Sequence, residues 1–182
     1  MKKIPALIFM LSFISIVCGA EKIDWKTDFS AKSDKMLTWK SAKAKVKITK
    51  DFADKERKQP AMIMVFDENT KNVNALAGKF FPIERNKKLT AVVTVKCTGF
   101  KDDGRVSVSM QGWKEKKSQI PAANTSSGKK ISECTEDKEI ALTFTVPEKG
   151  AWAKADWIYL TISAKAKGPG TVIFKDLEFY EE

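Results

Sequence analysis

The chain has 182 residues, and its 33 Lys and Arg outnumber its 23 Asp and Glu, so its formal net charge is +10 at pH 7. The absence of histidine excludes Ser-His-Asp triads, Cys-His pairs, HExxH zinc helices and imidazole proton shuttles. A content of 43% hydrophobic and 31% charged residues is typical of a globular domain.

Residues 1–20 have the layout of an export signal. Lys2 and Lys3 precede an apolar stretch from Ile4 to Val17, and Cys18-Gly19-Ala20 places small residues before a cleavage point. The apolar stretch is shorter than the roughly 18 to 20 residues that cross a bilayer, so we expect no transmembrane segment. We predict a secreted or periplasmic protein with one domain, residues 21–182. Lipidation of Cys18 is the alternative, although bulky Val17 stands where lipoprotein signals have a small residue.

Two cysteines remain after the signal, Cys97 and Cys134, in a compartment that permits disulfides. If they pair, the closed loop stabilises the fold by on the order of 3 to 4 kcal/mol. The other interpretation is two separate buried thiols, each packing as a small hydrophobic side chain.

Lysine dominates the positive charge, because only Arg57, Arg85 and Arg105 are arginine. Recognition of phosphates favours arginine forks, and binding of single strands needs basic residues interleaved with aromatic ones. We therefore expect no nucleic-acid partner. The lysines are interpreted first as solvated strand faces, and second as a surface attracted to acidic glycans. Arg85 is expected to be a solvated turn residue.

Alternation of apolar and polar residues with a period of two predicts β-strands along most of the chain. It is clearest in residues 89–97, 106–110, 140–146, 158–164 and 170–179. The turn sequence Asp102-Asp103-Gly104 predicts that the first two of these segments pair as a hairpin or lie side by side. We expect a polar loop at residues 114–130, and one helical turn or a loop at residues 69–76.

The last strand changes parity in its middle. Val172 and Phe174 share one side, whereas Leu177 and Phe179 have the opposite parity, so one extra residue is needed for all four to point inward. We predict a β-bulge at Lys175-Asp176. Strands at this spacing, joined by long connections and without an internal repeat, predict an all-β fold with two antiparallel sheets packed as a sandwich.

Three C-terminal segments follow one another in a suggestive order: a strand ending in valine-proline (144–147), a penultimate strand (157–160) and a closing strand with an aspartate (170–179). In these segments, and in Asp28-Phe29, Trp39 and Phe81-Pro82-Ile83 upstream, the chain resembles carbohydrate-binding modules of the galactose-binding-like jelly-roll type. The resemblance covers residues 24–182. It implies a jelly-roll sandwich, a polysaccharide or other glycan as partner, and a structural calcium held partly by Asp176. From the residues alone, one carboxylate without a cluster of oxygen ligands is weak evidence for calcium, and the other interpretation of Asp176 is an exposed residue of the bulge.

A sugar-binding surface needs flat aromatic rings for stacking and short polar groups for the hydroxyls. We take Trp113 and Trp157 as stacking platforms, Gln111 and Tyr159 as hydrogen-bonding partners, and Trp152 as a platform on a loop. The competing interpretation of each tryptophan is packing in the core or beneath a loop. The remaining polar residues assigned to this face are Ser107, Ser109, Thr143, Thr145, Thr161 and Ser163.

The sequence thus predicts an exported, non-catalytic carbohydrate-binding protein, and the alternative is a structural or protein-interaction β-sandwich of the bacterial envelope. A glycosidase needs two carboxylates about 5 to 9.5 Å apart in a cleft. Asp102, Asp103, Glu136 and Asp137 lie in predicted loops, but their lysine-rich settings indicate solvated groups rather than such a pair. We expect no cofactor apart from the calcium that the resemblance implies.

Overall fold

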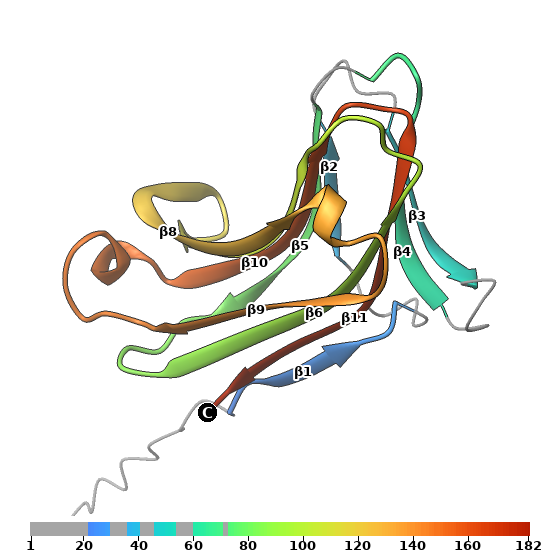
Figure 1. Cartoon of the computed structure of the whole chain (residues 1–182). Helices are drawn as coiled ribbons and strands as arrows, with labels where there is room; N and C mark the ends of the chain where they lie inside the picture. The colour runs from blue at the N-terminus through green and yellow to red at the C-terminus, as the bar shows by residue number, and fades with distance from the viewer. Residues whose placement is uncertain (1–21, 30–35, 41–45, 54–59, 71–72) are drawn as a thin grey trace, which may run out of the picture.

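The structure, a computed structural model, describes residues 22–29, 36–40, 46–53, 60–70 and 73–182. The described chain is a sandwich of two antiparallel β-sheets (Figure 1), which confirms the predicted fold class. Sheet A has the order β3-β4-β11-β6-β9, with β1 also paired to β11, and sheet B has the order β2-β5-β10-β7-β8. The elements are β1 (Asp24–Thr27), β2 (Leu37–Lys40), β3 (Val46–Ala53), β4 (Pro60–Phe66), β5 (Val73–Pro82), β6 (Lys88–Thr98), β7 (Arg105–Lys114), β8 (Ser118–Lys130), β9 (Lys138–Thr145), β10 (Trp157–Ala166), β11 (Gly170–Glu181) and two 3-10 turns, η1 (Ile131–Glu133) and η2 (Ala151–Lys154).

The predicted signal segment, residues 1–20, lies outside the described residues, so export stays a prediction. Within the described ranges, no helix is long and apolar enough to span a bilayer.

The core lies between the sheets and follows the period-two pattern of the sequence. In β10, which pairs with β5 on one side and β7 on the other, Ile158, Leu160, Ile162 and Ala164 are fully buried. Successive side chains of a strand point to opposite faces, so the residues between them point away from the core. These outward residues form part of the outer face of sheet B.

Three local predictions were wrong. Residues 89–97 and 106–110 do not pair, because β6 belongs to sheet A and β7 to sheet B, and the turn between them crosses from one sheet to the other. Residues 73–76 belong to strand β5, whose inward residues Ala75 and Ala77 are too small to give a strong hydrophobic pattern. Most of the predicted loop 114–130 is β8, an edge strand that is mainly polar on both faces.

The bulge in the last strand was predicted correctly. The register between β11 and β6 shifts between Phe174 and Leu177, and both residues are fully buried together with Val172 and Phe179. The extra residue in β11 therefore keeps both halves of this strand in the core.

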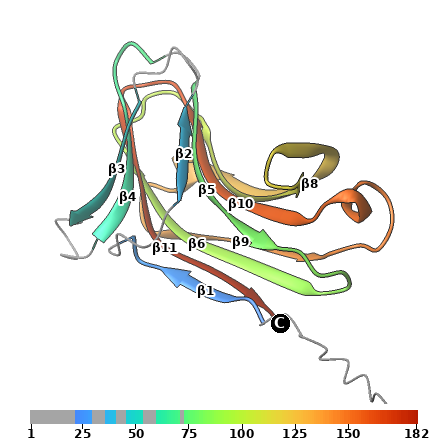
Figure 2. The same ribbon diagram turned by 180° about the vertical axis from the view of Figure 1, so that it is seen from behind.

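Both sheets are strongly bent, as the two opposite views agree (Figures 1 and 2). The strands β5 and β10 run along one arm of the molecule, turn, and continue along the other arm, with sheet A on the convex side of this turn. The outer face of sheet B is therefore concave. This shape makes it the natural place to look for a binding site.

The two cysteines are buried neighbours, and both are free thiols. The backbone N–H of Cys97 donates to the carbonyl oxygen of Cys134 at 2.6 Å. Burial raises the pKa of the Cys97 thiol to about 12, and the adjacent Cys134 adds to this effect. Pairing of these cysteines by oxidation stays a prediction.

We expect the reduced, folded protein to resist alkylation of Cys97 at pH 8. A thiol with a pKa of about 12 is about 0.01% thiolate at that pH, whereas an exposed thiol is roughly one-quarter ionised. Iodoacetamide labelling followed by peptide mass spectrometry checks this, with the same reduced sample in guanidinium as the control. Labelling of Cys97 at similar rates in both samples would contradict the buried, protonated thiol.

Candidate functional site

The outer face of sheet B carries four neighbouring strands whose paired residues lie in rows. Residues directly opposite one another in antiparallel strands project from the same face. One row runs Phe80, Tyr159, Gln111 and Asn124 across β5, β10, β7 and β8. The next row toward the β7–β8 turn contains Trp157 opposite Trp113. Register alone therefore brings four of the five predicted binding residues, from two distant sequence segments, onto one surface: Gln111, Trp113, Trp157 and Tyr159.

Three aromatic rings form a cluster on this face. Phe80 and Tyr159 stack with their centroids 4.5 Å apart and their planes at 29°. Trp113 meets both rings edge to face, at 5.4 Å from Phe80 and 5.6 Å from Tyr159, and it remains half-buried. Such pairs hold one another in fixed orientations, so the cluster is preorganised before any ligand arrives.

Glycine at position 78 lets Tyr159 lie against the sheet. A Cβ at Gly78 would stand 2.6 Å from Cζ of Tyr159 and 2.7 Å from the carbonyl oxygen of Leu160. The Tyr159 side chain consequently lies flat enough to be 8% exposed, and this burial raises its pKa. The Tyr159 ring therefore lies flat against the sheet at the base of the site and does not protrude from it.

Hydroxyl groups continue the face beyond the aromatic cluster. Ser109 and Thr161 are hydrogen-bonded at 2.5 Å between their hydroxyl oxygens, and Ser107 and Ser163 at 2.8 Å. Each pair links β7 to β10 on the outward side. Thr161, which was expected to face solvent, is only 2% exposed, whereas Ser107, Ser109 and Ser163 are half-buried. A hydroxyl has one proton to donate and two lone pairs, so the three serines keep acceptor capacity for a ligand.

Trp157 is held beneath a lysine from the turn between β7 and β8. In this turn Glu115 and Lys116 have φ of 50° and 58°, the left-handed values that the two central residues of a type I′ turn adopt. The Lys116 ammonium nitrogen lies 3.6 Å from the centroid of the Trp157 ring, a cation–π contact. One face of this indole is thus occupied by a flexible side chain.

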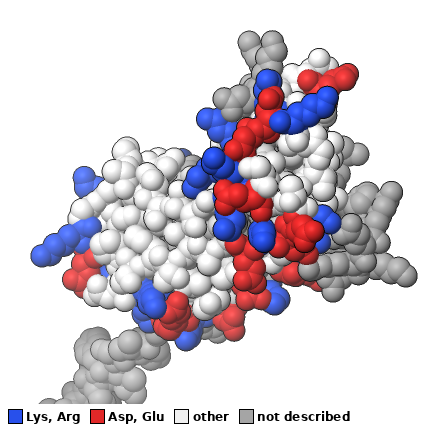
Figure 3. Space-filling model, viewed as in Figure 1, with Lys and Arg blue, Asp and Glu red and all other residues white. Residues whose placement is uncertain are grey.

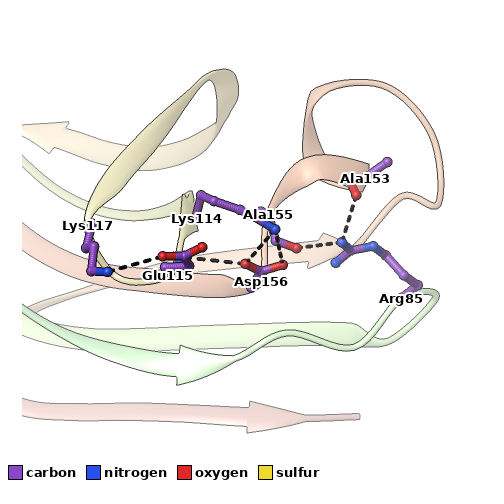
Figure 4. Close-up of polar contacts among 7 residues, drawn as sticks. All are labelled: Arg85, Lys114, Glu115, Lys117, Ala153, Ala155 and Asp156. Atoms are coloured by element: carbon purple, nitrogen blue, oxygen red, sulfur yellow. Dashed lines mark hydrogen bonds and ion pairs between the residues drawn. The ribbon is translucent and has the colours of Figure 1, made fainter.

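Asp156 fixes this turn (Figure 4). The ammonium of Lys114 lies 3.1 Å from one of its carboxylate oxygens, and the Glu115 N–H donates to the same oxygen at 3.4 Å. The hydrogen bond from Lys114 holds the pKa of Asp156 below its ordinary value. The carboxylate therefore stays ionised and supports the strained backbone of the turn.

Arg85 anchors the neighbouring η2 segment, whereas the sequence indicated a solvated turn residue. Its guanidinium donates to the carbonyl oxygens of Ala153 at 3.2 Å and Ala155 at 2.6 Å (Figure 4). This contact holds the chain immediately before Asp156 and Trp157. The correction reflects tertiary structure, because the acceptors are about seventy positions away in sequence.

A groove of about 520 Å³ opens over the aromatic cluster. Of the predicted binding residues, Trp113, Tyr159 and Gln111 line it, and Trp157 lies next to it under Lys116. Phe80, Lys116 and Gln119 also line it, and the sequence analysis missed them. Phe80 had a usable signal, because adjacent phenylalanines at 80 and 81 must point to opposite faces if they lie in a strand.

Trp152 is not a platform. Its side chain is 6% exposed and packs in the core, with its ring centroid 4.7 Å from that of Phe144. Thr143 and Thr145 are not part of the site either, because they lie on β9 in sheet A. Alternation predicted that these threonines point outward but not which sheet carries them.

The described residues do not fit a calcium site at Asp176. In the described ranges, no group of three or more Asp, Glu, His or Cys side chains is placed to hold a metal ion. Asp176 lies instead near Lys26, whose pKa it helps to raise. The positive charge of Lys26 would repel a divalent cation bound at this carboxylate.

Three of the four acidic loop residues considered for catalysis, all except Glu136, form ion pairs with lysines. Asp102 lies 2.8 Å from Lys167, and Asp137 lies 2.7 Å from Lys175. Asp103 is 3.8 Å from Lys130. In Figure 3, charges of both signs gather in a band that runs from the top to the bottom of the visible face, and the surface to the left of this band is mostly uncharged. Each of these three carboxylates therefore forms an ion pair with a lysine.

No protein-family model and no curated protein sequence matches the chain. Solved structures match its fold. The CBM22-1 and GH10 modules of xylanase 10B from Clostridium thermocellum, complexed with xylohexaose, give a TM-score of 0.61 at 14% identity and cover 90% of this chain and 29% of theirs. The enzymatically active domain of tailspike protein 4 from bacteriophage CBA120 gives 0.59 at 11% identity, over 85% of this chain and 20% of that one. This chain therefore spans less than a third of either protein.

Isolated binding modules match over most of their own length. A family 61 module complexed with β-1,4-galactotriose gives a TM-score of 0.53 at 12% identity, over 82% of this chain and 90% of that module. The CBM22-1 xylan-binding domain of Paenibacillus barcinonensis Xyn10C gives 0.52 at 6% identity, over 88% and 95%. The chain has the jelly-roll sandwich fold of carbohydrate-binding modules, which confirms the resemblance seen in the sequence at the level of fold.

The two tryptophans Trp152 and Trp113 should differ in their effect on stability. Trp152→Ala removes a core side chain and should lower the free energy of unfolding by about 3 to 5 kcal/mol, whereas Trp113→Ala, at a half-buried position, should cost less than half as much. Guanidinium denaturation followed by circular dichroism measures both. Equal losses would contradict the core position of Trp152.

Proposed function

We propose that the chain is an exported, non-catalytic protein that binds a poly- or oligosaccharide on the outer face of sheet B. The observation that carries this proposal is the cluster of Phe80, Trp113 and Tyr159 in a groove on a concave sheet face. Large aromatic side chains usually lie in the core, so three of them lining a groove on the outside of a sheet call for a ligand.

The chemistry of the face suits a sugar. A pyranose ring has an apolar C–H face and a polar rim, so it needs an aromatic surface next to hydrogen-bonding groups. Trp113 supplies the half-buried indole, with Gln111 accepting a hydrogen bond from its Nε1 at 3.4 Å. The hydroxyl pairs of β7 and β10 continue in the same direction and supply polar groups for further sugar units.

Two features support the non-catalytic and exported parts of the proposal. Two carboxylates at the β7–β8 turn, Glu115 and Asp156, form ion pairs with Lys117 and Lys114, which gives them a role in holding the turn. Several solved structures of similar fold are named as binding modules. Export rests on the layout of residues 1–20.

Affinity electrophoresis in gels containing xylan, galactan, β-glucan, mannan or polygalacturonate tests the proposal. We expect at least one polysaccharide to retard the protein, and we expect Trp113→Ala to weaken that binding by at least tenfold, about 1.4 kcal/mol, because it removes a stacking surface. Trp157→Ala should weaken it as well. Tyr180→Ala is the matched control, since Tyr180 is a half-buried aromatic residue on β11 in sheet A.

The control should bind like the unmodified protein. Retardation that survives loss of both tryptophans would remove the proposed site. No retardation in any gel would favour the structural or protein-interaction sandwich instead.

A further inference from the structure

Three cations stand side by side at the end of the outer face of sheet B that is remote from the aromatic cluster. Arg105 is directly opposite Lys165 of β10 on one side and Lys130 of β8 on the other. The next residues of β7 and β10, Val106 and Ala164, are fully buried, so Arg105 and Lys165 point outward. All three side chains are exposed.

The Arg105 side chain lies along this face. A Cβ at Gly128 would stand 3.1 Å from Nε of Arg105 and 2.8 Å from Cβ of Ser107. The guanidinium group thus extends over β8 beside the serine that begins the hydroxyl rows. The absent side chain at Gly128 leaves room for this orientation, which continues the cationic row into the polar part of the face.

Little within the protein balances these charges. Among the residues that the structure describes, no carboxylate lies within ion-pair distance of Arg105 or Lys165, and Lys130 reaches Asp103 only at 3.8 Å. The paired outward positions between this row and the aromatic cluster are uncharged: Ser107, Ser109, Gln111, Tyr159, Thr161, Ser163, Asn124, Ser126 and Gly128. Asp103 therefore partly balances Lys130, whereas Arg105 and Lys165 have no carboxylate partner among the described residues.

Such a row costs stability. Like charges directly opposite each other in a sheet repel, and the chain places two such pairs in succession on three strands. An anionic ligand lying across the row would relieve this repulsion, and the planar guanidinium of Arg105 suits carboxylate and sulfate oxygens. Basic residues that served only to keep the surface solvated would not need to be adjacent on three neighbouring strands of the face that carries the groove.

We propose that the ligand is an anionic polysaccharide, bearing carboxylate or sulfate groups, whose acid groups bind at Arg105, Lys165 and Lys130 while another part stacks on the aromatic cluster. This inference rests on the proposed function, since it names the class of glycan for the same face. Arg105 and Trp113 are eight positions apart on β7, which is at most about 26 Å at 3.3 Å per residue. A chain of several sugar units is therefore needed to reach both ends.

The test compares polygalacturonate and a sulfated galactan with neutral xylan and galactan, using the full protein. Affinity electrophoresis and isothermal titration should show tighter binding to an anionic polymer, and this binding should weaken as NaCl rises from 50 to 500 mM, because salt screens exposed charges. The double variant Arg105→Gln/Lys165→Gln should lose at least tenfold in affinity for the anionic polymer. Any binding to neutral polymers should change less than twofold. Preference between the uronate and sulfate polymers identifies the acid group.

The control Lys22→Gln/Lys149→Gln removes the same charge from two exposed lysines outside this face. It should keep the anionic affinity within twofold, and thermal unfolding should show that both double variants fold. An equal loss in both would mean attraction to overall charge and would overturn the inference. Binding of neutral polymers without preference for anionic ones would overturn it while the proposed function stands. Anionic binding that depends on Arg105 and Lys165 but survives Trp113→Ala would support the cationic row and remove the aromatic site.

Discussion

The register of β10 is the constraint on which the rest of the structure depends. This strand is paired on both sides, with β5 and β7, and its inward residues Ile158 and Leu160 are fully buried. A slip of one residue would bring Trp157 and Tyr159 into the core and turn the aliphatic residues toward water, since the side-chain period is two. The burial that stabilises the sandwich therefore also fixes which residues of β10 lie on the outer face, where the candidate site is. Function and stability share one alternating segment without competing for the same side chains.

The sequence predicted which face of each strand is buried better than it predicted which strands pair with one another. The alternation in β6, β7, β9 and β10 and the parity change in β11 each follow from which residues must be buried, so they could be recognised locally. The assignment of β6 and β7 to different sheets could not, because a turn sequence such as Asp102-Asp103-Gly104 serves a hairpin and a crossover equally well. Strand β5 was missed since Ala75 and Ala77 bury little area, and with it Phe80 was missed as a member of the cluster.

The candidate site was predicted in part for the same reason. Gln111, Trp113, Trp157 and Tyr159 were assigned to one surface from parity in two strands that happen to be neighbours. Trp152 lies in a 3-10 turn, where period-two reasoning gives no direction, and its burial depends on packing against a ring of sheet A. The contacts of the β7–β8 turn join segments about forty residues apart, so no local pattern could have indicated them.

The distribution of ion pairs separates the lysines into two groups with different roles. Those at the margins, such as Lys87 beside Glu181 and Lys114 beside Asp156, have carboxylate partners, and their contribution to stability is small because exposed pairs are screened by water and salt. On the outer face of sheet B, Lys116 contacts a ring instead, and Arg105 and Lys165 face each other. A surface selected only for solubility would place its charges where they repel least. Arg105 stands between Lys165 and Lys130, where these cations repel one another, at the end of the hydroxyl rows that is remote from the tryptophans. The anionic polymer that we propose would offset this repulsion on binding.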